Sequence, residues 1–287
     1  ITPSFKPGEY WEAISEGIDK AASETELYNV NVTKLFFDQY DNHTFDAIVR
    51  TLFDEEDIDG VLIATLFTDS VVRLSRELDA RDIPYVYVDS NIVGEHQLAY
   101  FGTESYDAGV IAARLLTDKI SSTSDILMAR IIHSGKNDSN QGKNRREGFC
   151  HYLKETGFTG NLHEVELKIN DSVYNFIKLD EIFEANATIE GGIIFNSTCY
   201  ILGNYLKARG MQKVKLVGYD LIERNTQLLS DGVITALVAQ RPERQGYDGI
   251  KSLCNHLLFK QNPEKVNLMP IDILLKENLK YYLNNKL

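Results

Sequence analysis

Two short apolar stretches of the chain each end on an aspartate. The first is IPYVYVDS, Ile83 to Ser90, which contains Asp89; the second is VKLVGYDL, Val214 to Leu221, which contains Asp220. In an open parallel sheet, ligands bind in the crevice outside the carboxyl ends of the strands. Asp is also a common helix N-cap, so either aspartate alone can equally be a cap of the next helix. Two of them, on what read as different domains, favour a shared cleft lined by carboxylates.

Such a cleft calls for hydrogen-bond donors opposite the carboxylates. Arg145 and Arg146 lie in NDSNQGKNRREGF, residues 137–149, at the predicted entry to a helix. Adjacent helix residues point about 100° apart, so one arginine can face a pocket while the other meets solvent. The alternative is that both are surface cations of an amphipathic helix.

Gln240 is a further candidate, in the stretch ALVAQRPERQG. It follows a predicted strand, and its amide offers both a donor and an acceptor, which suits a hydroxyl ligand. A glutamine in a loop is by itself a weak signal.

Two aromatic residues, Tyr10 and Trp11, stand at the amino end of the first predicted helix. An aromatic face beside polar groups suits a sugar ring, which is apolar on its faces and hydroxylated at its edge. Trp11 is the only tryptophan of the chain, and packing in the core is its alternative role.

The elements that must position these residues alternate between short apolar runs and helical patterns. Apolar residues at helical spacing predict helices, at 9–24, 44–56, 69–82, 104–120, 142–157, 173–186, 199–210, 222–232 and 242–259. The apolar runs predict strands at 30–37, 60–65, 84–89, 98–103, 126–132, 162–169, 191–196, 214–220, 234–239 and 269–276. The opening ITPSF resembles the tail of a further strand. Strands separated by helices run parallel with both faces covered, and there are too many for one open sheet of usual size. The pattern therefore predicts two doubly wound α/β domains.

Composition narrows the class of function. The chain has 42 acidic and 30 basic side chains, a net charge of −12, which argues against direct binding to nucleic acid. Its three cysteines have no paired spacing, which is typical of a reducing compartment. No apolar run approaches the length of a membrane span. The sequence contains no metal-ligand spacing, GxSxG elbow, P-loop or GxGxxG after a strand, so we expect no cofactor, no metal and no catalysis.

Six stretches occur in the order and spacing of a known family: DGVLIA, IPYVYVDS, YFGTESYDAGVIAARLL, NRREGF, KLVGYDL and ITALVAQRPERQGYDGI. Over essentially its whole length the chain resembles the lactose-repressor (LacI-type) transcription regulators and the related ribose-type periplasmic sugar-binding proteins. The resemblance implies two Rossmann-like lobes of the type I periplasmic-binding-protein fold, joined by three crossovers, with a small ligand clamped between them. The N-terminal lobe would comprise 1–101 plus about 241–268, and the C-terminal lobe 102–240 plus about 269–287.

The same resemblance assigns roles to single residues. Asp89 and Asp220 match carboxylates that bind sugar hydroxyls from the two lobes, Arg145 matches the ligand-binding arginine, and Gln240 matches the crossover glutamine. Tyr10 and Trp11 align with the paired aromatics of the sugar-binding proteins.

One departure from the family concerns the segment before the helix predicted at 199–210. The family usually has an Asn-Asp pair there, whereas this chain has NSTC, with Ser197 at the position of the asparagine and Asn196 just before it. Either Asn196 substitutes, or the ligand differs from a common pentose or hexose.

The function that these expectations imply is the sugar-sensing effector-binding and dimerisation domain of a cytoplasmic transcription regulator. A ligand that contacts both lobes favours one inter-lobe angle, which would alter the DNA affinity of a helix-turn-helix headpiece absent from this sequence. A homodimer is expected because paired headpieces read paired half-sites. The alternative is a periplasmic sugar-binding protein or sensor ectodomain, and the segment opening at Glu104 with Glu-x-x-x-x-Gly is closer to the repressors.

Overall fold

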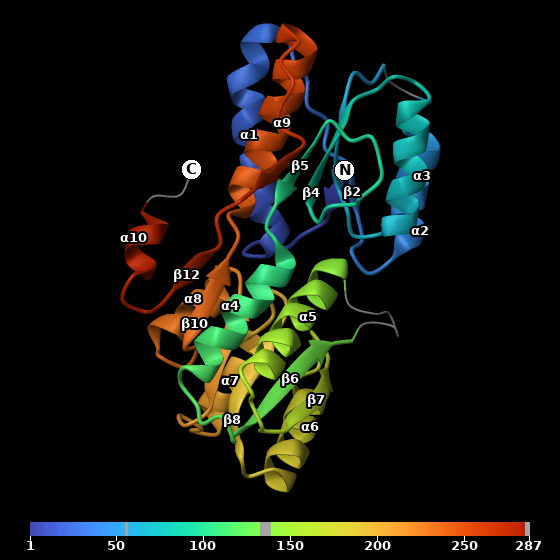
Figure 1. The fold of residues 1–287 in the computed structure, drawn as a ribbon. Coiled ribbons are helices and arrows are strands. Elements are labelled where there is room, and N and C mark those ends of the chain that lie inside the picture. The colour runs from blue at the N-terminus through green and yellow to red at the C-terminus, as the bar shows by residue number, and fades with distance from the viewer. Residues whose placement is uncertain (55–56, 133–138, 285–287) are drawn as a thin grey trace. The chain divides into compact units, whose positions relative to one another are not determined.

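Two compact units make up the chain, which is described here by a computed structural model covering residues 1–54, 57–132 and 139–284. Unit 1 comprises Ile1–Thr103 and Gln240–Pro270, and unit 2 comprises Glu104–Ala239 and the segment that begins at Ile271 (Figure 1). Gln240 is the first residue of the second segment of unit 1.

Unit 1 is built on parallel strands. Its main sheet has the order β11-β5-β4-β3, and β1 pairs with β2. Backbone bonds from the Ile1 amine to the Leu62 carbonyl (2.8 Å) and from the Ala64 N–H to the Ile1 carbonyl (3.0 Å) connect β1 to β3. The strands are β1 (Thr2–Pro3), β2 (Phe36–Phe37), β3 (Val61–Ala64), β4 (Tyr85–Asp89), β5 (Ala99–Gly102) and β11 (Val266–Leu268).

The helices of unit 1 are α1 (Tyr10–Thr25), α2 (Asn42–Thr51), α3 (Thr68–Asp79) and α9 (Pro242–Phe259), with a short 3₁₀ turn, η1 (Glu26–Tyr28). Helices α1 and α9 come from opposite ends of the sequence and lie side by side (Figure 1). Glycine allows this close approach: a Cβ on Gly17 would lie 1.9 Å from the Glu243 carbonyl oxygen, and one on Gly246 2.2 Å from that of Ile14. The contact fixes the amino ends of both helices, where Tyr10 and the Gln240 crossover lie.

Unit 2 contains one sheet in the order β12-β10-β9-β8-β6-β7. All of its pairs are parallel except β10 with β12, which is antiparallel. The strands are β6 (Asp125–Ile131), β7 (Leu162–Leu167), β8 (Ile189–Ile194), β9 (Lys215–Tyr219), β10 (Ala236–Ala239) and β12 (Asp272–Leu274).

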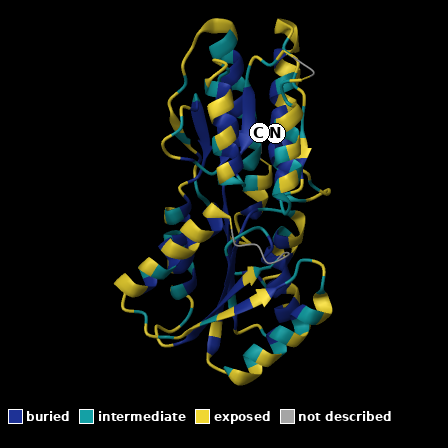
Figure 2. Cartoon of the chain, turned by 90° about the vertical axis from the view of Figure 1, so that its right-hand side faces the viewer, coloured by how far each residue is buried: buried dark blue, intermediate teal, exposed yellow. Residues whose placement is uncertain are grey.

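Helices cover both faces of the unit 2 sheet, namely α4 (Ser105–Thr117), α5 (Asn140–Glu155), α6 (Ser172–Ala185), α7 (Tyr200–Ala208) and α8 (Glu223–Ser230), with α10 (Leu279–Leu283) at the end of the chain. Alternate strand residues pack on opposite sides: Ile126 and Met128 contact α4 and α5, while Leu127 and Ala129 join the core under α6 and α7. The inner strands β6, β8, β9 and β10 are accordingly mostly buried between half-exposed helices, whereas the edge strands β7 and β12 are partly exposed (Figure 2). The predicted α/β class with doubly wound, mainly parallel sheets is confirmed.

Three local predictions were wrong or incomplete. The strand expected at 30–37 is reduced to Phe36–Phe37, because Lys34 turns to α1, where its ammonium donates to Ser15 and Asp19. The short strand β11 was not predicted. The last strand, β12, pairs with β10 and runs antiparallel to it, although helix α9 separates the two strands in sequence. Within the described residues, no helix is long and apolar enough to cross a membrane.

Candidate functional site

Asp89 is the last residue of β4 and lies buried at the carboxyl edge of the unit 1 sheet. Its φ is +77°, a left-handed conformation that Asp tolerates better than most residues. The Tyr10 hydroxyl donates to its Oδ1 at 3.0 Å. Its backbone N–H donates to Gln245 Oε1 (3.1 Å), and its carbonyl accepts from the Tyr100 hydroxyl (3.2 Å). No helix follows directly, so Asp89 is not a helix cap.

The two aromatic residues at the start of α1 are buried beside this edge. Tyr10 and Trp11 are 9% and 6% exposed, and their rings meet edge to face with centroids 5.1 Å apart. Tyr10 is thus hydrogen-bonded to Asp89, whereas Trp11 is a buried core residue, which is the alternative role considered for it.

Gln240 lies between the end of β10 and the start of α9 and is 3% exposed. Its Oε1 accepts from the Thr103 hydroxyl at 3.2 Å. Its carbonyl accepts from Gln245 Nε2 at 3.0 Å. Gln245 therefore bonds to the backbones of both Asp89 and Gln240, and it was not among the predicted site residues.

Asp220 repeats the arrangement of Asp89 in unit 2. It follows β9 directly, is 5% exposed, and has a φ of +68°. Helix α8 begins three residues later, at Glu223, with Ile222 as its N-cap, so Asp220 does not occupy the cap position. Its carbonyl accepts from the side-chain amide of Asn225 at 3.1 Å.

Arg145 is the largest fully buried side chain of the described residues, 1% exposed on α5. Its guanidinium donates to the Phe195 carbonyl at 3.0 Å and stacks on the Tyr219 ring, with Cζ 4.1 Å from the ring centre. Among the described residues its Nε has no hydrogen-bond partner, and no carboxylate forms an ion pair with it. Burial raises the pKa of Tyr219, so the ring beneath the cation stays neutral. A buried cation of this kind is costly unless a further acceptor reaches it.

The neighbouring Arg146 is exposed and forms an ion pair with Glu164, as expected for adjacent positions on one helix. Asn137 and Asp138, which belong to the same predicted stretch, lie outside the described residues.

The departure from the family pattern, NST at 196–198, forms a turn between β8 and α7. Asn196 Oδ1 accepts from the backbone N–H of Thr198 (3.0 Å) and from its hydroxyl (2.5 Å). The oxygen of Asn196 is therefore committed to this turn. Ser197 is half-buried, and its carbonyl accepts from Asn225 Nδ2 at 2.8 Å.

The eight predicted residues thus fall into two groups. Tyr10, Trp11, Asp89 and Gln240 gather in unit 1, and Arg145, Asn196, Ser197 and Asp220 in unit 2. Each group contains a carboxylate and an amide, and the group in unit 2 also contains a guanidinium. Side chains of these types can accept from and donate to hydroxyls. No group of three or more His, Cys, Asp or Glu in the described part of the chain could hold a metal ion.

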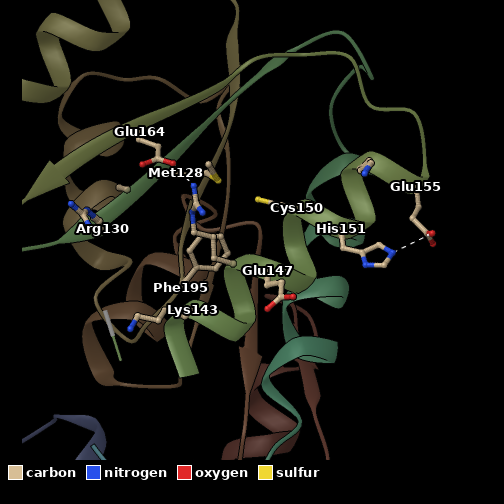
Figure 3. Close-up of a pocket in the computed structure, with 12 residues that line it drawn as sticks. Met128, Arg130, Lys143, Glu147, Cys150, His151, Glu155, Glu164 and Phe195 are labelled. Carbon is tan, nitrogen blue, oxygen red and sulfur yellow. Dashed lines mark hydrogen bonds and ion pairs between the residues drawn. The ribbon is translucent and has the colours of Figure 1, made fainter. Parts of the chain in front are cut away.

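A separate hollow of about 960 Å³ lies in unit 2, between α5 and the strands β6 and β7 (Figure 3). Met128, Cys150 and Phe195 line its interior, and Arg146 pairs with Glu164 at its rim. Burial raises the pKa of the Cys150 thiol, which makes it less reactive. The residues that line the hollow include none of the eight predicted site residues.

Known proteins match this chain both in sequence and in three-dimensional structure. The sequence model of the periplasmic binding protein domain matches residues 1–261. A crystal structure of a proposed LacI transcriptional regulator from Bacteroides fragilis is 36% identical, with a TM-score of 0.92 over 98% of this chain and 97% of that one. No curated protein matches the sequence.

Sugar-binding proteins share the fold at lower identity. GanP, a glucose-galactose binding protein from Geobacillus stearothermophilus, is 20% identical, with a TM-score of 0.82 over 97% of this chain and 96% of that one. An ABC transporter solute binding protein from Burkholderia graminis, in complex with D-arabinose, is 17% identical, with a TM-score of 0.84 over 98% and 96%. At these identities the likeness concerns the fold alone.

Proposed function

This chain belongs to the periplasmic binding protein domain family, and from that premise we propose that it binds a sugar or sugar derivative through the eight residues described above. The ligand hydroxyls donate to Asp89 and Asp220, while Arg145 and the amide of Gln240 donate in return. A bond from a guanidinium is charge-assisted and stronger than a neutral one. Binding without chemical conversion is the activity, so the protein is not an enzyme.

The observation that carries this proposal is the state of Arg145. Its guanidinium is buried, rests on Tyr219, and keeps an unbonded Nε within the described structure. A structural arginine in a core normally has its donors satisfied by carboxylates or carbonyls. A ligand oxygen would accept a hydrogen bond from this unbonded Nε. Asp220 lies at the strand edge of the same unit, where it can accept from the hydroxyls of that ligand.

We further propose that the ligand is an effector and the chain the effector-binding and dimerisation core of a LacI-type transcription regulator. The 36% identity to a proposed LacI regulator over nearly the full length of both chains supports this role. The ligand acts by its differential affinity for two arrangements of the protein, and that difference changes the DNA affinity of a helix-turn-helix headpiece in the full-length protein. A homodimer in the cytoplasm is the expected working form.

A thermal-shift screen tests the binding proposal. The protein is heated with a panel of mono- and disaccharides, sugar acids, phosphorylated sugars and nucleosides. A ligand that binds only the folded state stabilises it by RT ln(1 + [L]/Kd), about 2.7 kcal/mol at a hundredfold excess over Kd. One sugar that raises the melting temperature, and does so no longer in the Arg145→Ala variant, supports the site. A panel without any shift counts against a sugar ligand.

The regulatory role has its own test. DNA upstream of the gene is mixed with the full-length protein, with and without the sugar found in the screen. DNA binding that the sugar strengthens or abolishes supports a regulator. A full-length protein that begins with a secretion signal and binds no DNA would instead be a periplasmic binding protein or sensor.

A further inference from the structure

We propose that two buried amides, Asn225 and Gln245, are positioning residues that hold the ligand-binding loops of the two units without touching the ligand. This inference rests on the proposed function. Each amide belongs to the first turn or so of a helix and bonds to backbone atoms of two site loops, including the loop of the strand-end aspartate. The sequence comparison with the family assigns neither of them a role.

Asn225, in α8, connects the loop after β9 to the loop after β8. Its Nδ2 donates to the carbonyls of Ser197 (2.8 Å), Tyr219 (3.0 Å) and Asp220 (3.1 Å). Its Oδ1 accepts from the backbone N–H of Tyr200 at 3.0 Å. The side chain is 0% exposed. Its two amide hydrogens are both engaged by the three carbonyls, so the Nδ2 has no donor left for a ligand.

Gln245, in α9, plays the equivalent part in unit 1. Its Oε1 accepts from the Asp89 N–H at 3.1 Å, and its Nε2 donates to the Gln240 carbonyl at 3.0 Å. It too is 0% exposed. The two bonds join residues 89 and 240, which are far apart in sequence, into one rigid edge.

The conformation of the aspartates explains why such a support is needed. Asp89 and Asp220 both have positive φ, which is unfavourable for a residue with a Cβ and persists only where the surroundings impose it. In each case the amide bonds to the aspartate's own peptide group, at its N–H in Asp89 and at its carbonyl in Asp220. Removing the amide deletes these hydrogen bonds to buried backbone groups, and rotation of the peptide is the route by which the groups replace them.

A matched control separates positioning from general core packing. Asn175, in α6, is also a buried amide, 3% exposed, that bonds twice to backbone, to the N–H and carbonyl of Lys168 at 2.7 Å each. None of its bonds reaches a site loop. Asn225→Ala and Asn175→Ala therefore remove the same side chain from equally buried positions.

The test compares crystal structures and amide NMR spectra of the two variants in the absence of any ligand. We expect Asn225→Ala to move Asp220 out of positive φ and to shift the amide resonances of 197–200 and 219–221. Asn175→Ala should leave those signals in place. If Asn225→Ala does not fold, Asn225→Ser, which keeps one short donor, replaces it. An Asp220 that retains its φ in the folded variant overturns the proposal for Asn225.

Gln245→Met keeps the length of the side chain and removes both bonds, so Asp89 and Gln240 should change conformation. Ser75→Ala is the control. It removes a fully buried hydroxyl that is bonded to Val71 and Tyr87, and it should leave Asp89 and Gln240 unchanged. In Gln245→Glu the acceptor for Asp89 is retained and the donor to Gln240 is lost, so only Gln240 should move. An unchanged Asp89 in Gln245→Met overturns the proposal for Gln245.

None of these measurements needs a ligand. A sugar panel without any thermal shift therefore refutes the proposed function and not this inference.

Discussion

The guanidinium carbon of Arg145 lies 4.1 Å from the centre of the Tyr219 ring. Tyr219 is fully buried, and its hydroxyl donates to the carbonyl of Ala108 in α4 at 3.1 Å. The ring that supports the cation is thus itself fixed by a helix. Cation–π contacts are worth about 2 kcal/mol or more when desolvated, so this stack offsets part of the hydration that Arg145 loses.

Substitutions of Tyr219 should separate the ring from its hydroxyl. Tyr219→Phe keeps the platform and loses one hydrogen bond, so we expect the free energy of unfolding to fall by about 1 kcal/mol with sugar affinity nearly unchanged. Tyr219→Leu removes the platform, and affinity should fall roughly thirtyfold, the equivalent of a desolvated cation–π contact of about 2 kcal/mol. Urea unfolding and calorimetric titration with the sugar found in the screen measure the two effects. Equal affinity in both variants would show that the stack does not support binding.

Asp125 predicts a dependence of stability on pH. It is buried at the start of β6, where its carboxylate accepts from the Thr188 hydroxyl (2.7 Å), His163 Nε2 (2.9 Å) and the Asn161 N–H (2.7 Å). These bonds hold the pKa of Asp125 well below its ordinary value, with the Thr188 hydroxyl the largest cause.

Because the folded-state pKa is lowered, the stabilisation by Asp125 is fully present above the ordinary carboxyl pKa of about 4. It should be lost as the pH falls through that value toward the lower folded-state pKa. Urea unfolding of the wild-type protein and of Asp125→Asn, measured at pH 7, 5, 4 and 3, checks this. The difference in unfolding free energy between them should shrink as the pH falls; a constant difference would contradict the assignment.

The contact between α4 and α5 predicts an intolerant glycine. A Cβ on Gly148 would lie 2.0 Å from the Tyr106 carbonyl oxygen, which is backbone and cannot rotate away. Gly148→Ala should therefore destabilise by about 1–3 kcal/mol, as overpacking does. Gly203 in α7 is the control, since its Cβ would meet only side-chain atoms, the nearest being the tip of Leu228 at 2.8 Å. There the gain in helix propensity of about 1 kcal/mol offsets the crowding, and thermal unfolding of Gly203→Ala should be close to wild type.

Much of the architecture was predictable because its signals are local. Apolar runs ending on Asp89 and Asp220 identify strands and their carboxyl ends, and adjacent arginines on one helix predict that one is buried and the other exposed. Arg145 and Arg146 follow that rule. The segment 30–37 does not form the full strand that its apolar pattern predicts, because the ion pair of Lys34 with Asp19 draws it to α1. Such a tertiary contact leaves no signal in the periodicity of the sequence.

The support of the site could not be predicted from the sequence. Gln245 bonds to Asp89 across 156 positions, and Asn225 looks like any polar residue near a helix start. The commitment of Asn196 Oδ1 to its own turn likewise depends on backbone geometry. Only the choice of Asp at both strand ends hinted at positive φ, since Asp is among the few residues that tolerate it.

The comparison of Arg145→Ala with Arg146→Ala is the sharpest test of the site as a whole. The two residues are adjacent on α5 and carry the same charge, but Arg145 is buried without an ion pair, while Arg146 is exposed and paired with Glu164. Hydrogen bonds to a charged group contribute about 1.5–3 kcal/mol, so Arg145→Ala should weaken binding of the screened sugar by roughly ten- to a hundredfold or more.

The fold should survive Arg145→Ala, because the variant removes a buried charge that no carboxylate balances by an ion pair in the described structure. Arg146→Ala should leave affinity within about twofold of wild type, since an exposed ion pair contributes at most about 1 kcal/mol even to stability. Calorimetric titration measures affinity, and near-UV circular dichroism verifies that both variants are folded. If Arg145→Ala binds the sugar as wild type does, the guanidinium is a structural group of unit 2, and the assignment of Asp220 and Asn196 to a sugar site loses its main support.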